Sequence, residues 1–167
     1  MQLSVLLGRP LATPSGDRVG RVDDVIVRLR GGDYPLVIGL VAKLGGRRLF
    51  LGVDKLVRLD DDPVVLRKPR VDPREFERRE GEVLLRQDIL GHRLIDVADV
   101  ELVRAWDVEI EHKDEGWVLS CVDTRRPTRL RGLLRRPAVE AGVGQDWLAF
   151  EPLIGHASSA DSRRSFG

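Results

Sequence analysis

Cysteine, aromatic residues and long apolar runs are all scarce in this chain. Among its 167 residues there is one cysteine, one tyrosine and three tryptophans, and aromatic residues make up 5%. The lone Cys121 excludes an intrachain disulfide, so we expect a reducing compartment and a cytoplasmic location. Its apolar neighbours Leu119 and Val122 are typical of a buried strand thiol. No run approaches the ~20 apolar residues of a membrane span, and the N-terminus has no basic, apolar leader, so we expect no direct membrane span.

Motifs for catalysis or metal binding are also missing. The sequence has no His-x-x-x-His, no Cys-x-x-Cys, no Gly-x-Ser-x-Gly and no glycine-rich phosphate loop before a helix. The histidines, His92, His112 and His156, lie far apart. Asp60-Asp61-Asp62 has oxygen ligands suited to Mg²⁺, but three adjacent carboxylates before a proline favour a solvated turn. We therefore predict no enzyme activity, no cofactor and no metal site.

A hairpin organises the first half of the chain. The β-branched runs Val19–Leu29 and Leu36–Val41 flank Gly31-Gly32-Asp33, and glycine tolerates the positive φ of a tight hairpin. The first run alternates apolar residues with Arg28 and Arg30, as expected for a strand. The second run is apolar on both faces, which favours a closed or wrapped small barrel over a flat sheet.

Parts of this block return later in the chain. Leu7-Gly8 corresponds to Leu90-Gly91, a spacing of 83 residues, and Asp24-Val25 corresponds to Asp107-Val108 at the same spacing. After a small change of length in the turn, we align Val37 with Val118. A fixed spacing indicates an internal duplication. Because Asp24 and its copy Asp107 each precede an alternating strand, we predict that they bond a neighbouring turn.

Short apolar segments between turns predict a mainly β fold. Beside the hairpin, we expect strands at Met1–Leu11, Arg48–Val53, Val57–Leu59, Val64–Leu66, Ala105–Glu111, Trp117–Val122, Leu130–Leu134 and Trp147–Phe150. Asp72, Pro73 and the helix-prone residues up to Gly81 predict one or two helical turns. The prediction is two small antiparallel β-barrels in tandem joined by a short helical linker. The boundaries are 1–70 for the first barrel, 71–83 for the linker, 84–155 for the second, degenerate barrel, and 156–167 for a disordered tail.

Arginines near the end of the second copy form the candidate interaction surface. A net charge of +1 argues against polyanion binding by bulk charge, but a local stripe can meet RNA phosphates, anionic lipids or an acidic protein face. No aromatic platform interleaves with it, which weakens the case for single-stranded nucleic acid, and a solvated barrel surface is the plain alternative. For Trp106, Trp117 and Trp147 we expect core packing of the second barrel. The stripe consists of Arg125, Arg126, Arg129, Arg131, Arg135 and Arg136.

The first copy resembles the PRC-barrel domain family. The likeness rests on Leu7-Gly8-x-x-Leu11, Gly16-Asp17-x-Val19-Gly20-x-Val22-x-Asp24-Val25 and Leu36–Val41; the second copy lacks the Gly-Asp and Val-Gly pairs. The tandem order, with Asp146–Gly155 closing the second copy, resembles the cytosolic N-terminal region of actinobacterial MgtE-like, magnesium transporter-related proteins. Short glycine-based motifs specify a fold more than an activity.

The resemblance implies a non-catalytic adaptor or regulatory module that binds protein. Its expected partner is a second copy of the chain, or a membrane transporter, including helical, CBS or transport domains of a longer magnesium-transport-related protein. The alternative, from the likeness to the PRC-barrel half of the ribosome-maturation factor RimM, is RNA or ribosome binding. RNA is the less favoured partner because net charge is near zero and no stacking platform is visible.

Overall fold

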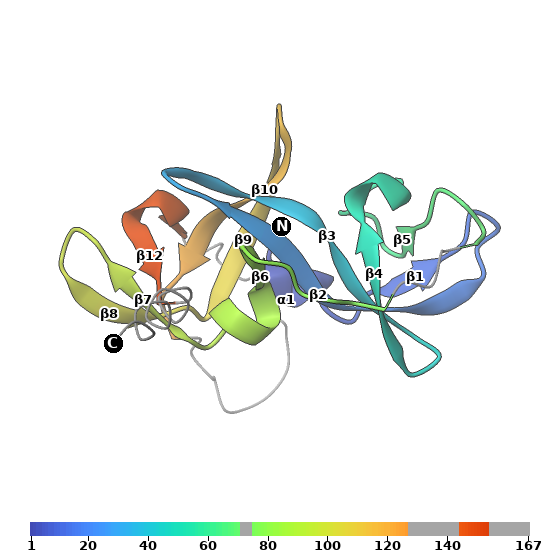
Figure 1. The fold of residues 1–167 in the computed structure, drawn as a ribbon, viewed down its shortest axis with the longest axis horizontal. Coiled ribbons are helices and arrows are strands. Elements are labelled where there is room, and N and C mark those ends of the chain that lie inside the picture. Colours follow the sequence, from blue (N-terminus) through green and yellow to red (C-terminus); the bar gives the residue numbers. More distant parts are fainter. Residues whose placement is uncertain (71–74, 127–143, 154–167) are drawn as a thin grey trace, which may run out of the picture.

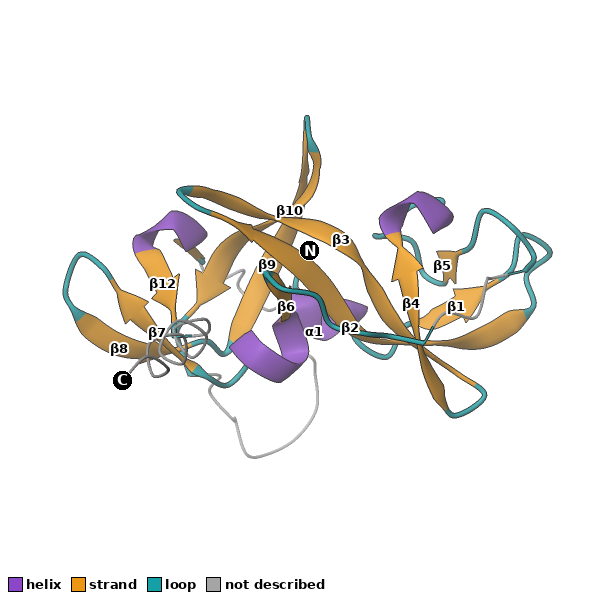
Figure 2. Ribbon diagram, viewed as in Figure 1, coloured by secondary structure: helices purple, strands orange, loops and turns teal. Residues whose placement is uncertain are grey.

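The computed structural model describes residues 1–70, 75–126 and 144–153. The described chain is mainly β, with four short helical segments (Figure 2). The helices are α1 (Leu3–Leu6), the 3₁₀ turns η1 (Val53–Lys55) and η3 (Trp147–Ala149), and the π-helical turn η2 (Leu85–Ile89). In the part of the chain that is described, no helix is long and apolar enough to cross a bilayer.

Twelve strands form two sheets in the described residues. One sheet has the order β11-β10-β3-β2-β1-β5, with β4 on β3, β6 on β2 and β9 on β10; the other has the order β12-β7-β8. The strands are β1 (Pro10–Ala12), β2 (Arg18–Arg30), β3 (Asp33–Leu44), β4 (Arg47–Gly52), β5 (Val64–Val65), β6 (Glu82–Leu84), β7 (Arg93–Asp96), β8 (Glu101–Arg104), β9 (Asp107–Lys113), β10 (Gly116–Asp123), β11 (Gln145–Asp146) and β12 (Phe150–Pro152).

The predicted hairpin is present and forms the backbone of the fold. β2 and β3 pair from Arg21–Lys43 to Arg30–Asp33, and Gly32 takes φ +77° in the turn. Three irregularities in this register give the pair a strong local twist. The two long strands cross the middle of the molecule, with β1, β4 and β5 towards one end and β7, β8 and β12 towards the other (Figure 1).

The same contacts recur 83 residues apart. Gly8 and Gly91 have φ +80° and +79°, and their N–H groups donate to the carbonyls of Val22 and Ala105 at 2.8 and 2.6 Å. β1–β2 pairing at Leu11–Gly20 matches β7–β8 pairing at Leu94–Val103. We refer to residues 7–67 and 90–152 as the first and second repeat.

The alignment within the returning strand needs a correction of one residue. Val37 pairs with Val27, and Leu119 pairs with Ile110, so Val37 corresponds to Leu119 and not to Val118. The reason is an irregularity near Tyr34: β3 needs three residues to go from the partner of Arg30 to the partner of Arg28, whereas β10 needs two for the equivalent step. One residue is therefore added to the first repeat at that point.

The opening segment that precedes each repeat packs against the other repeat. The chain start runs beside β9, where the Met1 carbonyl accepts from the Ile110 N–H at 2.8 Å, and β6 pairs with β2 at Val83–Val27. Six apolar side chains of these opening segments are fully or almost fully buried, whereas Val5 is exposed; the buried ones are Leu3, Leu6, Val83, Leu84, Leu85 and Ile89. One continuous hydrophobic core therefore includes residues from both repeats.

Two expected strands are partly helical. Residues 1–11 were predicted as a strand, but Leu3–Leu6 form α1, because a helical turn points Leu3 and Leu6 into the same core. Trp147–Phe150 were also predicted as a strand. Instead, the Asp146 carboxylate accepts from the Leu148 N–H at 2.9 Å and starts η3, and only Phe150 enters β12.

Two further segments are irregular. Val57–Leu59, predicted as a strand, lie outside any strand, and only the Leu56–Leu66 bridge brackets this loop. The predicted helix before Gly81 is absent from residues 75–81, and residues 71–74 lie outside the described part. Glu75 forms a bridge with Leu49, and Phe76 packs near Ile26 and Val41. Pairing with β4 and burial of Phe76 outweigh the local helix propensity.

Candidate functional site

The predicted arginine stripe is mostly outside the described residues. Arg125 and Arg126 are exposed at the end of β10, and the Arg125 guanidinium lies 3.7 Å from Asp123. Arg129, Arg131, Arg135 and Arg136 fall between 127 and 143, as does the strand predicted at 130–134. The described part of the stripe is thus a solvated pair beside one carboxylate.

The acidic turn is held by arginines. The Arg58 guanidinium donates two hydrogen bonds to the Asp60 carboxylate at 3.0 and 2.7 Å, and the Arg9 guanidinium donates to the backbone carbonyls of Asp60 and Asp61. The bonds from Arg58 hold the pKa of Asp60 below its usual value. Among the described residues, no group of three or more metal-ligating side chains converges.

Cys121 lies in β10 and is half-buried. Burial raises the pKa of its thiol, so the thiol is protonated near neutral pH and a poor nucleophile. Cys121 is therefore a strand thiol as predicted, but it is half-buried and not fully buried. Trp147 is buried in the core as predicted, while Trp106 is half-buried with the Arg104 guanidinium 5.5 Å from its ring.

The hydrogen bonds of Asp24 and of Asp107 to separate turns confirm the structural role predicted for both residues. The fully buried Asp24 carboxylate accepts from the backbone N–H groups of Val25, Arg86 and Gln87 at 2.7, 2.7 and 3.1 Å, and so caps η2. Asp107 accepts from the Ser4 N–H at 3.2 Å and from the Ser4 hydroxyl beside α1. The carboxylate of each repeat thus binds the helical turn that precedes the other repeat.

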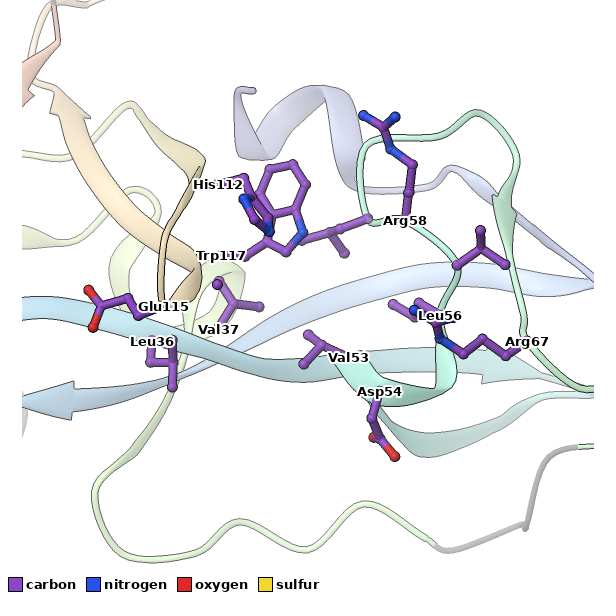
Figure 3. A pocket seen from close by; sticks show the side chains of 13 residues that line it. Leu36, Val37, Val53, Asp54, Leu56, Arg58, Arg67, His112, Glu115 and Trp117 are labelled. Atoms are coloured by element: carbon purple, nitrogen blue, oxygen red, sulfur yellow. The ribbon is translucent and has the colours of Figure 1, made fainter.

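A groove between the two repeats is a candidate site. Its volume is about 330 Å³. The β9–β10 hairpin of the second repeat forms one wall, and the loop after η1 forms the other, with Val37 and Val53 between them (Figure 3). The residues of this inter-repeat groove are Leu36, Val37, Val53, Asp54, Leu56, Val57, Arg58, Leu59, Arg67, His112, Glu115, Gly116 and Trp117.

The second-repeat wall consists of an aromatic pair. The rings of His112 and Trp117 are edge to face, with centroids 5.2 Å apart and planes at 85°. They come from opposite strands of the hairpin, where His112 and Trp117 are direct partners. Trp117, predicted to pack in the core, is half-buried: it packs against the edge of the core and also borders the groove.

The equivalent aromatic side chain of the first repeat has polar partners. Tyr34 occupies the position of Trp117 at the 83-residue spacing, and its hydroxyl donates to the Asp146 carboxylate at 2.7 Å. The Lys113 ammonium lies 3.8 Å from the centre of the Tyr34 ring. The register of β10 with β11 and of β3 with β4 places Gly52 where the second repeat has Asp146. Gly52 has no side chain, and within the described residues Trp117 has no carboxylate partner like that of Tyr34.

In the described part of the chain, some charged side chains that border the groove have a partner of opposite charge, and one does not. Glu115 accepts two hydrogen bonds from Arg30 at 2.7 and 3.0 Å, which hold its pKa below the usual value. Asp54 lies 3.0 Å from the Lys55 ammonium. Arg67 is exposed, and within the described residues it has no carboxylate partner. The groove therefore combines apolar walls with one uncompensated positive charge.

The groove could not be found in the sequence. Its walls come from segments more than 50 residues apart, such as Val57 and Trp117, and no local motif marks either. The available signal was the exchange of Tyr34 for Trp117 at equivalent positions of the repeat. No family model matches this chain, and no curated protein resembles it at a significant level.

Proposed function

We propose that the chain is a tandem pair of PRC-type β-barrels that acts as a non-catalytic adaptor. The support is the resemblance of the first copy, together with hydrogen bonds and strand pairs that recur 83 residues apart. In this proposal the two barrels share the exchanged opening segments and hold the groove between them. Its cellular place is the cytoplasm, in line with the lone, protonated thiol.

The adaptor binds a protein segment in the inter-repeat groove. The single observation that carries this proposal is the difference between the two equivalent aromatic side chains: Tyr34 is hydrogen-bonded to Asp146, whereas Trp117 borders a groove. Tryptophan is enriched where partners bind, since it offers a large apolar surface with one polar atom. Val57, 44% exposed, adds apolar surface on the facing wall.

The partner in this proposal is a membrane transporter or the remainder of a magnesium-transport-related chain; a second copy of this chain is the other candidate. The arginine stripe is a second contact surface. Changing Arg129 and Arg131 to glutamate together should weaken the complex if the stripe takes part, and unchanged association would remove it.

A photo-crosslinking amino acid placed at Val57 tests the proposal directly. The matched control carries the same group at Val100, which is 82% exposed and outside the groove. In host cells, Val57 should give one defined protein adduct that excess unlabelled chain competes away, and Val100 should not give it. Identical adducts at both positions, or none at Val57, would contradict groove binding.

RNA binding is the second candidate, because Trp117, Arg58 and Arg67 line the same groove (Figure 3). An aromatic ring beside arginines is the arrangement that single-stranded nucleic acid uses. In the crosslinking experiment this candidate predicts a ribonuclease-sensitive adduct at Val57. It also predicts an affinity that falls steeply with salt.

A further inference from the structure

We propose that the inter-repeat groove selects an extended acidic peptide, with an apolar side chain against Trp117 and a carboxylate on Arg67. This inference deepens the adaptor proposal and rests on it. It names the chemistry of the bound segment, which the adaptor proposal leaves open.

The apolar part of the groove is built for an aliphatic side chain. Its lining is mainly aliphatic, from Leu36, Val53 and Leu56 to the exposed Val57, and Trp117 lines the same groove. Figure 3 shows Trp117 across the groove from Leu56. Burial of an aliphatic side chain here removes apolar surface from water on both partners. A volume of about 330 Å³ is at the small end of ligand sites, so the groove admits a few residues of an extended segment and not a folded domain.

The charge of the bound segment follows from which border groups are already paired. Asp54 is paired with Lys55, Glu115 with Arg30, and Arg58 with Asp60. Within the described part of the chain, Arg67 is left without a carboxylate. A guanidinium binds a carboxylate through two parallel hydrogen bonds, which a planar acidic side chain or a C-terminus provides.

Peptide chemistry fits the groove better than nucleic acid. One face of the aromatic pair is used by the contact between His112 and Trp117, which leaves no stack of exposed rings for successive bases. A phosphate backbone also needs a row of cations, whereas Arg58 is already bound to Asp60. A single free arginine beside aliphatic side chains matches one carboxylate next to one apolar residue.

A displayed random peptide library, selected on the whole chain, tests the inference. Selected peptides should carry aspartate, glutamate or a free C-terminus within a few positions of an aliphatic or aromatic residue. Binding of one selected peptide is then measured by calorimetry. Arg67→Glu should weaken it about tenfold or more, the loss expected when a charge-assisted pair becomes a repulsive one. The matched control Arg93→Glu makes the same charge change on exposed β7, outside the groove, and should leave the affinity unchanged.

A milder variant tests the apolar contact without disturbing the fold. Val57→Ser removes apolar surface from an exposed loop position, and it should weaken the peptide severalfold. Selection on the Arg67→Glu chain should instead enrich lysine or arginine at the acidic position.

Several outcomes would overturn the inference. These are selected peptides without an acidic group, no selected peptides, equal effects of Arg67→Glu and Arg93→Glu, or tighter binding of a ten-residue oligouridylate than of any selected peptide. If the Val57 crosslink still captures a defined protein in any of these cases, the adaptor proposal stands and only the acidic-peptide inference fails. If the crosslink also fails, both are wrong.

Discussion

At the scale of single residues, Asp24 is a buried carboxylate held by backbone hydrogen bonds. It is fully buried, and its carboxylate accepts three backbone N–H bonds that join β2 to η2. Burial raises the pKa of Asp24, although the hydrogen bonds from Arg86 and Val25 act in the opposite direction. A residue with this geometry connects the two repeats as well as capping a turn.

Asp24→Asn should destabilise the protein by about 1–3 kcal/mol, since an amide NH₂ then faces the N–H of a backbone donor. Asp107→Asn is the matched control at the equivalent position; its contacts with Ser4 face solvent, so its loss should be below about 1 kcal/mol. Urea unfolding at neutral pH measures both. Equal losses would mean that burial of the Asp24 bonds is unimportant.

The pH dependence at Asp24 has a definite sign. The folded pKa is above the unfolded value, so the folded state binds the proton more tightly than the unfolded state does. The contribution of Asp24 to stability is therefore full below the ordinary carboxyl range and falls as pH rises through the raised pKa. The difference in stability between wild type and Asp24→Asn, measured by unfolding from pH 4 to 8, should show this trend. A difference that grows in favour of wild type with rising pH would contradict it.

Tyr34 is open to direct titration because it is the single tyrosine of the chain. The hydrogen bond to Asp146 raises the pKa of Tyr34 to about 12. Ultraviolet absorbance of tyrosinate should give a midpoint near this value, and Asp146→Asn should move the midpoint towards the ordinary value of about 10. The same midpoint in both proteins would show that the Tyr34–Asp146 bond does not form in solution.

At the scale of elements, the hairpins were predictable, whereas the helical turns α1, η2 and η3 were not. The β2–β3 pair follows from alternation and from a glycine turn, which are local signals. The turns at Leu3–Leu6 and Trp147–Ala149 depend on contacts with distant segments: the first buries Leu3 and Leu6 in the shared core, and the second begins at an Asp146 cap. Likewise, the helix-prone segment around Phe76 is not helical, because it pairs with β4 and Phe76 packs in the small cluster with Ile26.

Gly39 tests how closely β3 and β4 approach. A Cβ at Gly39 would lie 2.5 Å from the Leu51 carbonyl oxygen and 2.7 Å from the Phe50 ring, so Gly39→Ala should destabilise the protein by about 1–3 kcal/mol through forced shifts of backbone. Gly31→Ala is the control, since nothing lies within 4 Å of its Cβ position. Thermal unfolding followed by circular dichroism compares them. A similar melting temperature for both variants would show that β4 moves freely.

At the scale of the whole molecule, the 83-residue spacing in the sequence predicts a duplicated unit but not the exchange of opening segments between the two units. A repeat of 83 residues is equally compatible with two closed units, each with its own opening segment, and with two units that trade them. The choice depends on burial of Leu3, Leu6, Leu85 and Ile89, which pack in the one shared core. For the same reason the inter-repeat groove could not be predicted: it exists only once both repeats are placed side by side.

The exchange predicts that the two halves stay together after the chain is cut. A protease site introduced between Arg70 and Glu75 divides the protein into one piece with α1 and one with η2. Each piece then buries its opening segment in the other, through β6–β2 pairing, the Asp24 cap and the chain start on β9. Size-exclusion chromatography of the cut protein should therefore give one peak at the position of the intact chain, and urea should unfold it in a single transition. Adding the Asp24→Asn change should make the pieces separate at a lower urea concentration than the otherwise identical cut protein does.

Two native pieces that separate without denaturant would contradict the exchange of opening segments. Barrels that each contain their own opening segment would not stay associated once the connection between them is cut.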